Sequence, residues 1–332
     1  MTDNKKDKTG YLASLKSVET EDWLDFHLVR PFCYHLARFL AKFGIHPNTV
    51  TIWSIIIGAG SCVFFAHGSF YYEGVRGLVL NLIAVFLLCW ADIFDCTDGQ
   101  LARLTGQKSR LGRILDGVAG FIWYMFIYVA IAYRFYLHHG LEFGWFGIEN
   151  TAENTMIATC VVVALGLYSG FVCMAGQTRL ADYYIQVHLF FLKSAKGSEF
   201  DNSKKQQEIY EQTSWKGNWV WKAFLNSYVG YTRKQEKATP QFQRMMKLMK
   251  EKYGSVEQVP SAIRQEFHDQ SLALMKWNGL LTFNFRSAIF FLACLLDVPV
   301  MNFIFEIVVM SLLAWYINHR HESFSKQIAQ KL

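Results

Sequence analysis

Six long apolar stretches constrain this chain more than any other feature of its sequence. A helix needs about 20 largely apolar residues to cross the hydrocarbon core of a bilayer. Stretches that meet this requirement cover 49–67, 75–92, 118–137, 155–176, 277–296 and 298–318. With 52% hydrophobic and only 18% charged residues in 332, the composition excludes an ordinary soluble enzyme. We therefore expect an all-α polytopic membrane protein with six transmembrane helices.

The Lys and Arg residues between these stretches predict which side of the membrane each connection faces. Cytoplasmic loops carry the excess of these two residue types. The arm before residue 49, the link at 93–117, the segment 193–276 and the tail 319–332 are rich in them, whereas 138–154 contains none. Both termini are therefore expected in the cytoplasm. The sequence indicates an integral membrane protein whose long polar segments face the cytoplasm.

The polar segments divide the chain into five parts. These are a cytoplasmic arm with an amphipathic helix at 1–48, four spans at 49–192, a cytoplasmic helical insertion at 193–276, two spans at 277–318 and a tail at 319–332. The polar start of the arm does not have the pattern of a secretory signal. Apolar residues from Trp23 to Phe43 recur at near-helical spacing, which predicts a helix either on the membrane interface or packed under the membrane domain.

Four aspartates lie where the second apolar stretch ends and the third begins. Asp95 and Asp98 are three residues apart and face the same side of a helix, with Asp92 one turn earlier. A turn through Gly99 is expected to lead to the next helix, which carries Asp116. Clustered carboxylates repel one another unless a cation neutralises them, and hard divalent ions prefer oxygen ligands. Such ions also bridge diphosphates and polarise phosphoryl oxygens.

The segment 95–116 resembles the signature of the CDP-alcohol phosphotransferase (CDP-alcohol phosphatidyltransferase) family. That signature reads D-x-x-D-G-x-x-A-R, eight residues, then G-x-x-x-D-x-x-x-D. The matching positions are Asp95, Asp98, Gly99, Ala102, Arg103, Gly112 and Asp116. Before the first span, Pro47-Asn48-Thr49-Val50-Thr51 resembles a second pattern of the family, Pro-Asn-x-x-Thr. Interfacial charges that merely pair with one another would not require this spacing.

The resemblance implies a role for each matching position. Asp95, Asp98 and Asp116 would bind one or two divalent ions, Mg²⁺ or Mn²⁺, against the diphosphate of a CDP-linked donor. Gly99, Ala102, Arg103 and Gly112 would form the nucleotide pocket, and Thr51 would contact the cytidine. Arg103 would contact a phosphate or maintain the spacing of the helices. The family also implies a lipid substrate and a homodimer, and no nucleic-acid partner is expected.

The last aspartate of the signature is replaced by Gly120, which can neither bind a metal nor accept a proton. In the family this aspartate is usually assigned as the base that deprotonates the acceptor alcohol. Another group could supply the base, the donor or acceptor could differ from the usual pair, or the protein could be inactive. Asp92 is the nearest candidate base in sequence, although it also fits a metal ligand or a helix-end charge. Asp116, Asp92 and Arg103 are therefore the candidate catalytic residues.

Three arginines are candidates for binding the acceptor. Arg179 follows the fourth span and Arg320 follows the sixth, and in the family branch that uses inositol phosphate such basic residues hold the acceptor phosphate. For Arg320 and its histidine neighbours, positive-inside anchoring is the simpler interpretation. Arg286 lies inside the fifth span and needs a partner, a cavity or a lipid phosphate. Glu306 in the sixth span is one possible partner.

These features favour a phospholipid-synthesis transferase that joins CDP-diacylglycerol to an alcohol such as inositol phosphate and releases CMP. One alternative is a synthase that places a phospho-head group on another lipid alcohol, such as a ceramide. A catalytically silent relative that binds nucleotide or lipid is a second alternative, and Gly120 favours it. A transporter would use Arg286 and Glu306 as an intramembrane pair, but it would not need the nucleotide motif.

Overall fold

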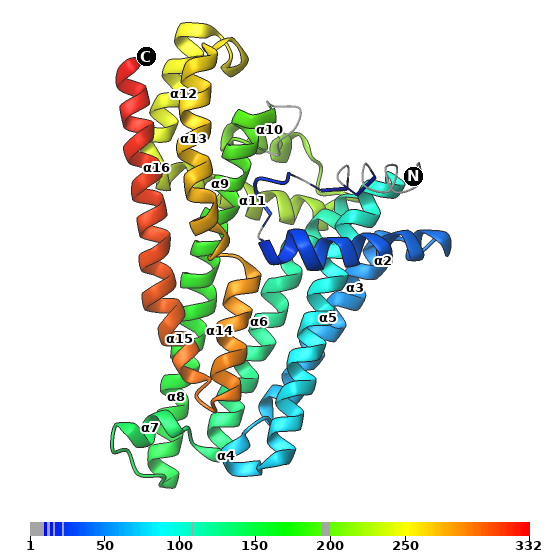
Figure 1. The fold of residues 1–332 in the computed structure, drawn as a ribbon, viewed down its shortest axis with the longest axis vertical. Helices are drawn as coiled ribbons and strands as arrows, with labels where there is room; N and C mark the ends of the chain where they lie inside the picture. Colours follow the sequence, from blue (N-terminus) through cyan, green and yellow to red (C-terminus); the bar gives the residue numbers. More distant parts are fainter. Residues whose placement is uncertain (1–9, 12–13, 16, 22, 108, 194–199) are drawn as a thin grey trace. The chain divides into compact units, whose positions relative to one another are not determined.

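The described part of the chain consists of helices and connections, without a strand, which confirms the all-α class. This computed structural model describes residues 10–11, 14–15, 17–21, 23–107, 109–193 and 200–332. The start of the arm and residues 194–199 of the insertion lie outside the described residues. The elements labelled in Figure 1, with the short π-helical and 3₁₀ segments written η, are η1 (Asp25–Val29), α2 (Arg30–Lys42), α3 (Pro47–Ala66), α4 (Phe70–Glu73), α5 (Val75–Thr105), α6 (Arg110–His138), α7 (Leu141–Trp145), α8 (Ala152–Tyr168), η2 (Ser169–Met174), α9 (Ala175–Lys193), α10 (Ser203–Gln212), α11 (Trp219–Ala238), α12 (Pro240–Tyr253), η3 (Val256–Gln258), α13 (Ser261–Gly279), α14 (Phe283–Leu295), α15 (Val300–Phe305), η4 (Glu306–Met310) and α16 (Ser311–Lys331).

Six helical stretches of the described chain are long and apolar enough to cross a membrane, which confirms the expected number. They run over Pro47–Ala66, Val75–Thr105, Ile114–His138, Ala152–Leu192, Ser261–Leu295 and Val300–Lys331. Several extend well past the predicted apolar stretches because the helices continue into the polar segments that follow. A helix satisfies all of its internal backbone hydrogen bonds, which is the requirement for a segment surrounded by lipid.

The turn expected at Gly99 is wrong. Helix α5 continues for 31 residues to Thr105 and ends at Gly106, which has a φ of 72°. This left-handed conformation commonly terminates helices and favours glycine. Asp92, Asp95 and Asp98 therefore lie on one uninterrupted helix. The turn to α6 comes only after Arg103, which lies on the same helix.

The chain divides into two compact units, which are described separately. The first contains residues 1–174 and 284–309, and the second contains 175–283 and 310–332. In the first unit, α3 packs against α5 and α6, while α2 lies across α5 (Figure 1). Helix α2 buries Cys33, Tyr34, Ala37 and Leu40 and exposes Phe32, Phe39 and Phe43. It therefore packs under the membrane helices, one of the two expected arrangements, and also retains an exposed apolar face.

The second unit contains the insertion, whose described residues are helical. Helix α12 packs against α16, and α13 packs against both α9 and α16. An aromatic cluster joins these helices, because Phe267 of α13 stacks on Phe191 of α9 and contacts Phe324 of α16. Phe242 of α12 also packs on Phe267. Burial of these large rings supplies the main stabilising contact of the unit.

A buried charge in the first unit lies where two long helices contain π-helical segments. Glu306, the first residue of η4, is fully buried and forms an ion pair with Arg286 at 2.8 Å. Its second carboxylate oxygen accepts hydrogen bonds from the Tyr128 hydroxyl at 2.5 Å and from Ser169, the first residue of η2. The predicted pairing of Arg286 with Glu306 is thus confirmed. π-helical turns change the direction of side chains along a helix, which suits this convergence.

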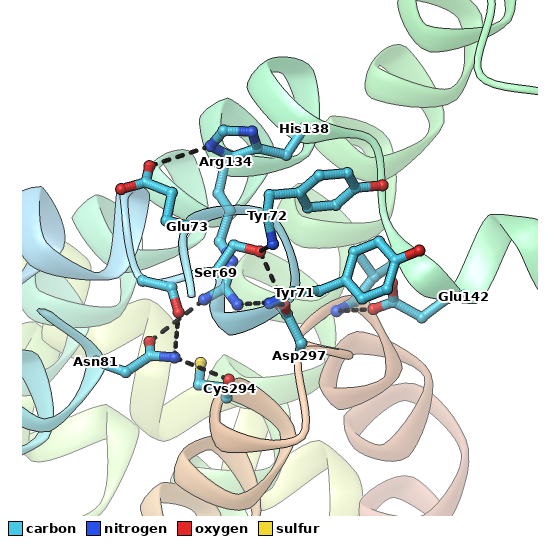
Figure 2. A network of polar contacts seen from close by, with 12 residues as sticks. Ser69, Tyr71, Tyr72, Glu73, Asn81, Arg134, His138, Glu142, Cys294 and Asp297 are labelled. Carbon is cyan, nitrogen blue, oxygen red and sulfur yellow. Dashed lines mark hydrogen bonds and ion pairs between the residues drawn. The ribbon is translucent and has the colours of Figure 1, made fainter. Parts of the chain in front are cut away.

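A second polar network lies where α3 and α4 connect and where the chain turns after α14. Figure 2 shows Asp297 between Ser69, Tyr71 and Arg134. The Asp297 carboxylate accepts from the Ser69 hydroxyl at 2.8 Å and from the Tyr71 amide at 2.7 Å, and it pairs with Arg134 of α6. Asn81 of α5 donates to the carbonyl of Cys294 at 2.9 Å. The network therefore joins α4, α5, α6 and the end of α14.

Replacing Asp297 with alanine is expected to destabilise the protein. The change leaves the buried Arg134 guanidinium without its ionic partner, and removal of one member of a buried pair costs about 3–5 kcal/mol. The midpoint of thermal unfolding of the purified protein should therefore fall clearly. Glu149→Ala, at an exposed carboxylate, is the control and should leave the midpoint unchanged. Equal midpoints for both variants would show that the network does not stabilise the fold.

Candidate active site

The predicted metal ligands lie on two helices of the first unit, Asp95 and Asp98 on α5 and Asp116 on α6. Asp98 is buried, Asp95 is half-buried and Asp116 is exposed. The charges that act on Asp95 include those of Asp116, Asp98 and Asp92, so these carboxylates are electrostatic neighbours. Because α5 continues past Gly99, the helical spacing of Asp95 and Asp98 is retained. Asp116 is brought to them by the return of the chain into α6.

Two carboxylate oxygens of this cluster are of the kind that a divalent cation prefers as ligands. Oδ1 of Asp95 and Oδ2 of Asp98 are buried and lack a hydrogen-bond partner in the part of the chain that the structure describes. Burying a carboxylate oxygen without a partner is costly. A cation with hard oxygen ligands, such as Mg²⁺ or Mn²⁺, would compensate both this cost and the repulsion between the aspartates. Asp95, Asp98 and Asp116 are the residues that could hold it.

The Pro-Asn-x-x-Thr segment contacts both ends of the aspartate motif. Thr51 is buried, and its hydroxyl lies within hydrogen-bonding reach of the Asp98 carboxylate and of the Pro47 carbonyl at 3.2 Å. Asn48 accepts a hydrogen bond from the Ser109 hydroxyl at 3.0 Å. Ser109 also caps α6 by accepting from the Gly112 amide at 2.8 Å. Asn48 was not among the predicted site residues, although the motif contained the signal for it.

Gly112 is required by close packing. A Cβ at this position would lie 2.7 Å from Oδ1 of Asn48 and 3.0 Å from Oγ of Ser109. Contacts this short require a neighbour to move. Gly112 therefore permits the close approach between the start of α3 and the start of α6. The nucleotide contact predicted for Gly112 stays a prediction.

Arg103 contacts the N-terminal arm. Its Nε donates to the main-chain carbonyl of Ser14 at 2.5 Å, and Glu21 and Asp116 are among its charged neighbours. The terminal nitrogens lie 3.4 and 3.6 Å from the position that a Cβ on Gly99 would occupy. Arg103 is thus close to the carboxylate motif, but its partner Ser14 gave no signal in the sequence. Ala102 lies beside it on α5 and is half-buried.

The environment of Gly120 is open. A Cβ at Gly120 would meet no atom within 4 Å, so the space for the missing carboxylate is not filled by a described neighbour. Asp92, the candidate replacement, is half-buried, and the charges that act on it are those of Asp25 and Arg30. Asp92 therefore has charged neighbours on η1 and α2. Its catalytic role stays a prediction.

The predicted acceptor residues are divided between the units. Arg286 lies in the first unit, where its charge is balanced by Glu306. Arg179 of α9 and Arg320 of α16 lie in the second unit, with Arg179 half-buried and Arg320 exposed. The main-chain carbonyl of Arg179 accepts from Gln235 at 3.1 Å. Binding of an acceptor by these three arginines stays a prediction.

The fold defines a polytopic all-α membrane protein, with a group of aspartates on α5 and α6. Residues 44–195 match the sequence model of the CDP-alcohol phosphatidyltransferase family. Over 81 residues, 24% of this chain, the sequence is 35% identical to a phosphatidylinositol phosphate synthase of Streptomyces avermitilis, of which the match covers 29%. No solved structure matches the chain significantly. Residues 44–195, slightly under half of the chain, are therefore similar to the CDP-alcohol phosphatidyltransferase family.

Asp95→Asn and Asp116→Asn are expected to weaken the binding of Mn²⁺. Each change removes one negative charge and one anionic ligand from the cluster, and even loss of an outer-shell partner costs about 10–100-fold in metal affinity. Binding of Mn²⁺ by the purified protein can be followed by electron paramagnetic resonance. Glu153→Gln, which alters an exposed carboxylate of α8, is the control. Wild-type affinity in both aspartate variants would place the metal elsewhere.

Proposed function

We propose that this protein transfers a phosphate-linked lipid group from a CDP-activated donor, CDP-diacylglycerol, to the hydroxyl of an alcohol such as inositol phosphate. The single observation that carries this proposal is that Asp95, Asp98 and Asp116 stand at the spacing of the family signature and that the charges of Asp98 and Asp116 act on Asp95. The family match and the name of the synthase from Streptomyces avermitilis support it. The match spans less than a third of that relative. The acceptor is therefore proposed from the phosphate-transfer chemistry of the site as well as from the similarity to that synthase.

The roles of the residues follow from their positions. Asp95, Asp98 and Asp116 would hold Mg²⁺ or Mn²⁺, which when bound neutralises the donor diphosphate and polarises its phosphoryl oxygens. Arg103 places a guanidinium beside the carboxylates, where it can donate to a phosphate oxygen. The acceptor hydroxyl oxygen forms a bond to the phosphorus attached to the lipid, the bond from that phosphorus to the CMP oxygen breaks, and CMP leaves.

The proton of the acceptor hydroxyl needs a base that Gly120 cannot supply. We retain Asp92 as the candidate, because it lies one turn from Asp95 on α5. Arg30 and Asp25 are its charged neighbours. A base must also come within hydrogen-bond reach of the proton that it takes.

The same proposal includes the setting of the reaction. The arms and links rich in Lys and Arg favour an active site that faces the cytoplasm of a bacterial inner membrane. Similarity to the family favours a homodimer. A second candidate function is transfer of a phospho-head group to a lipid alcohol such as a ceramide, which the open space at Gly120 favours. A catalytically silent relative is the third candidate, and Gly120 also favours it.

Release of CMP by the purified protein in lipid tests these candidates. With Mg²⁺ or Mn²⁺ and CDP-diacylglycerol, we expect CMP to appear with one member of a panel of alcohols that includes inositol phosphate and a ceramide. Asp95→Asn should abolish the reaction and serves as the control for contaminating activity. CMP formation that is equal in the wild type and in Asp95→Asn, or absent with every acceptor despite bound metal, would refute the transferase.

Gly120→Asp tests whether the missing carboxylate is a defect. The side chain has room, because a Cβ at this position meets no atom within 4 Å. If the chain lacks only its base, turnover should rise by about 10²–10⁴-fold, the usual contribution of general base catalysis. Gly117→Asp, also at an open position on α6, is the matched control. Unchanged or lower turnover in Gly120→Asp would show that another base or another acceptor is used.

A further inference from the structure

The described residues of the N-terminal arm between 10 and 21 pack on the rest of the first unit. Ser14, Leu15 and Ser17 are each less than a tenth exposed. The Tyr11 hydroxyl donates to the carbonyl of Phe26 at 2.8 Å. The arm is thus attached to η1 by a hydrogen bond and contributes buried residues of its own.

The Tyr11 ring and the end of the arm provide further attachments to α2. The ring packs edge-on against Tyr34, with 5.8 Å between the ring centroids. At the end of the arm, Glu21 forms an ion pair with Arg30 at 2.9 Å. The main-chain carbonyl of Arg30 in turn accepts from Gln100 of α5 at 3.2 Å. Through Arg30, the arm is therefore linked to α2 and then to α5, the helix that carries Asp95 and Asp98.

The contact between Ser14 and Arg103 reaches the motif itself. The Ser14 carbonyl accepts from Nε of Arg103 at 2.5 Å. A guanidinium has five N–H donors in a fixed planar arrangement, so this bond uses one donor and sets the plane of the others. Nη1 and Nη2 lie over Gly99, the residue that follows Asp98 in the motif. The arm thus determines where the terminal donors of Arg103 lie relative to the carboxylates.

We propose that the N-terminal arm is a positioning element of the active site. The Ser14 carbonyl holds Arg103 so that its terminal N–H groups are directed toward the donor diphosphate before the donor binds. Without this anchor, the long side chain would have to be ordered at each binding event, which lowers affinity and misplaces the charge in the transition state. Ser14 acts through its main chain, so the effect does not depend on its side chain. This inference rests on the proposed function.

A double-mutant cycle tests whether the arm acts through Arg103. The variants are a deletion of residues 2–18, Arg103→Ala, and the two changes combined, with kcat and KM measured from CMP release. Each single change should lower kcat/KM at least about tenfold, given that small misplacements of an active-site group can cost about 10²-fold. The combined variant should have the same kcat/KM as Arg103→Ala alone, because without the Arg103 side chain the arm has no group to position. A deletion of residues 2–8 should behave like the full chain.

Additive losses in the combined variant would overturn the inference, as would wild-type kcat and KM after deletion of 2–18. Tyr11→Phe is a second, milder variant that removes only the bond to the Phe26 carbonyl. It should lower kcat/KM in the wild-type background and leave Arg103→Ala unaffected. If Tyr11→Phe lowers both equally, the arm has a structural role alone.

Thermal unfolding of the same four proteins provides a readout that needs no substrate. Contact between the arm and Arg103 should make the shifts of the unfolding midpoint non-additive, whatever reaction the protein catalyses. If the shifts of the unfolding midpoint are additive, the arm and Arg103 do not interact, and the inference is refuted. Absence of CMP release by the full chain with every donor would refute the proposed function, while the unfolding cycle would still decide whether the arm positions Arg103.

Discussion

Charge balance inside an apolar helix bundle is the constraint on which this structure depends. A buried charge needs a partner of opposite sign, because solvation by water is lost. Glu306 is balanced by Arg286 and Asp297 by Arg134. Asp95, Asp98 and Asp116 instead place like charges together, with two carboxylate oxygens that no described group satisfies. This difference supports the proposal that an external cation binds at the aspartate cluster rather than at either ion pair.

The main features of the fold could be predicted because bilayer thickness acts on every span in the same way. The apolar composition of Pro47–Ala66, for example, is enough to predict a membrane-spanning helix. The helix ends were harder to predict. Gly99 was expected to be a turn, but a glycine inside a helix costs only about 1 kcal/mol relative to alanine, and the actual end depends on the left-handed backbone of Gly106. Ser169 and Glu306, where the two π-helical segments start, are joined by a hydrogen bond between distant segments, which local sequence does not show.

The candidate site was predictable to the extent that its residues lie within one motif. Spacing along a helix is enough to place Asp95 beside Asp98, and Thr51 was found because it belongs to a second short pattern. The partner of Arg103 could not be found in this way. Ser14 contributes a main-chain carbonyl, which every residue type carries, and it lies 89 positions away in the chain. Contacts of this kind depend on tertiary packing, so a sequence pattern predicts the groups that do chemistry better than those that position them.

Gly120 indicates which half of the reaction has changed in this chain. The positions that the family signature assigns to the donor and its metal are present, and Thr51, Asn48 and Gly112 pack around them with short contacts. Gly120, the position assigned to the acceptor proton, has lost its carboxylate, and the structure leaves the space beside it open. Had the site simply degenerated, the donor side would be under no constraint to keep its spacing and its close packing. If the chain acts as the proposed transferase, the side of the site that handles the acceptor proton is therefore where we expect it to differ from the family pattern.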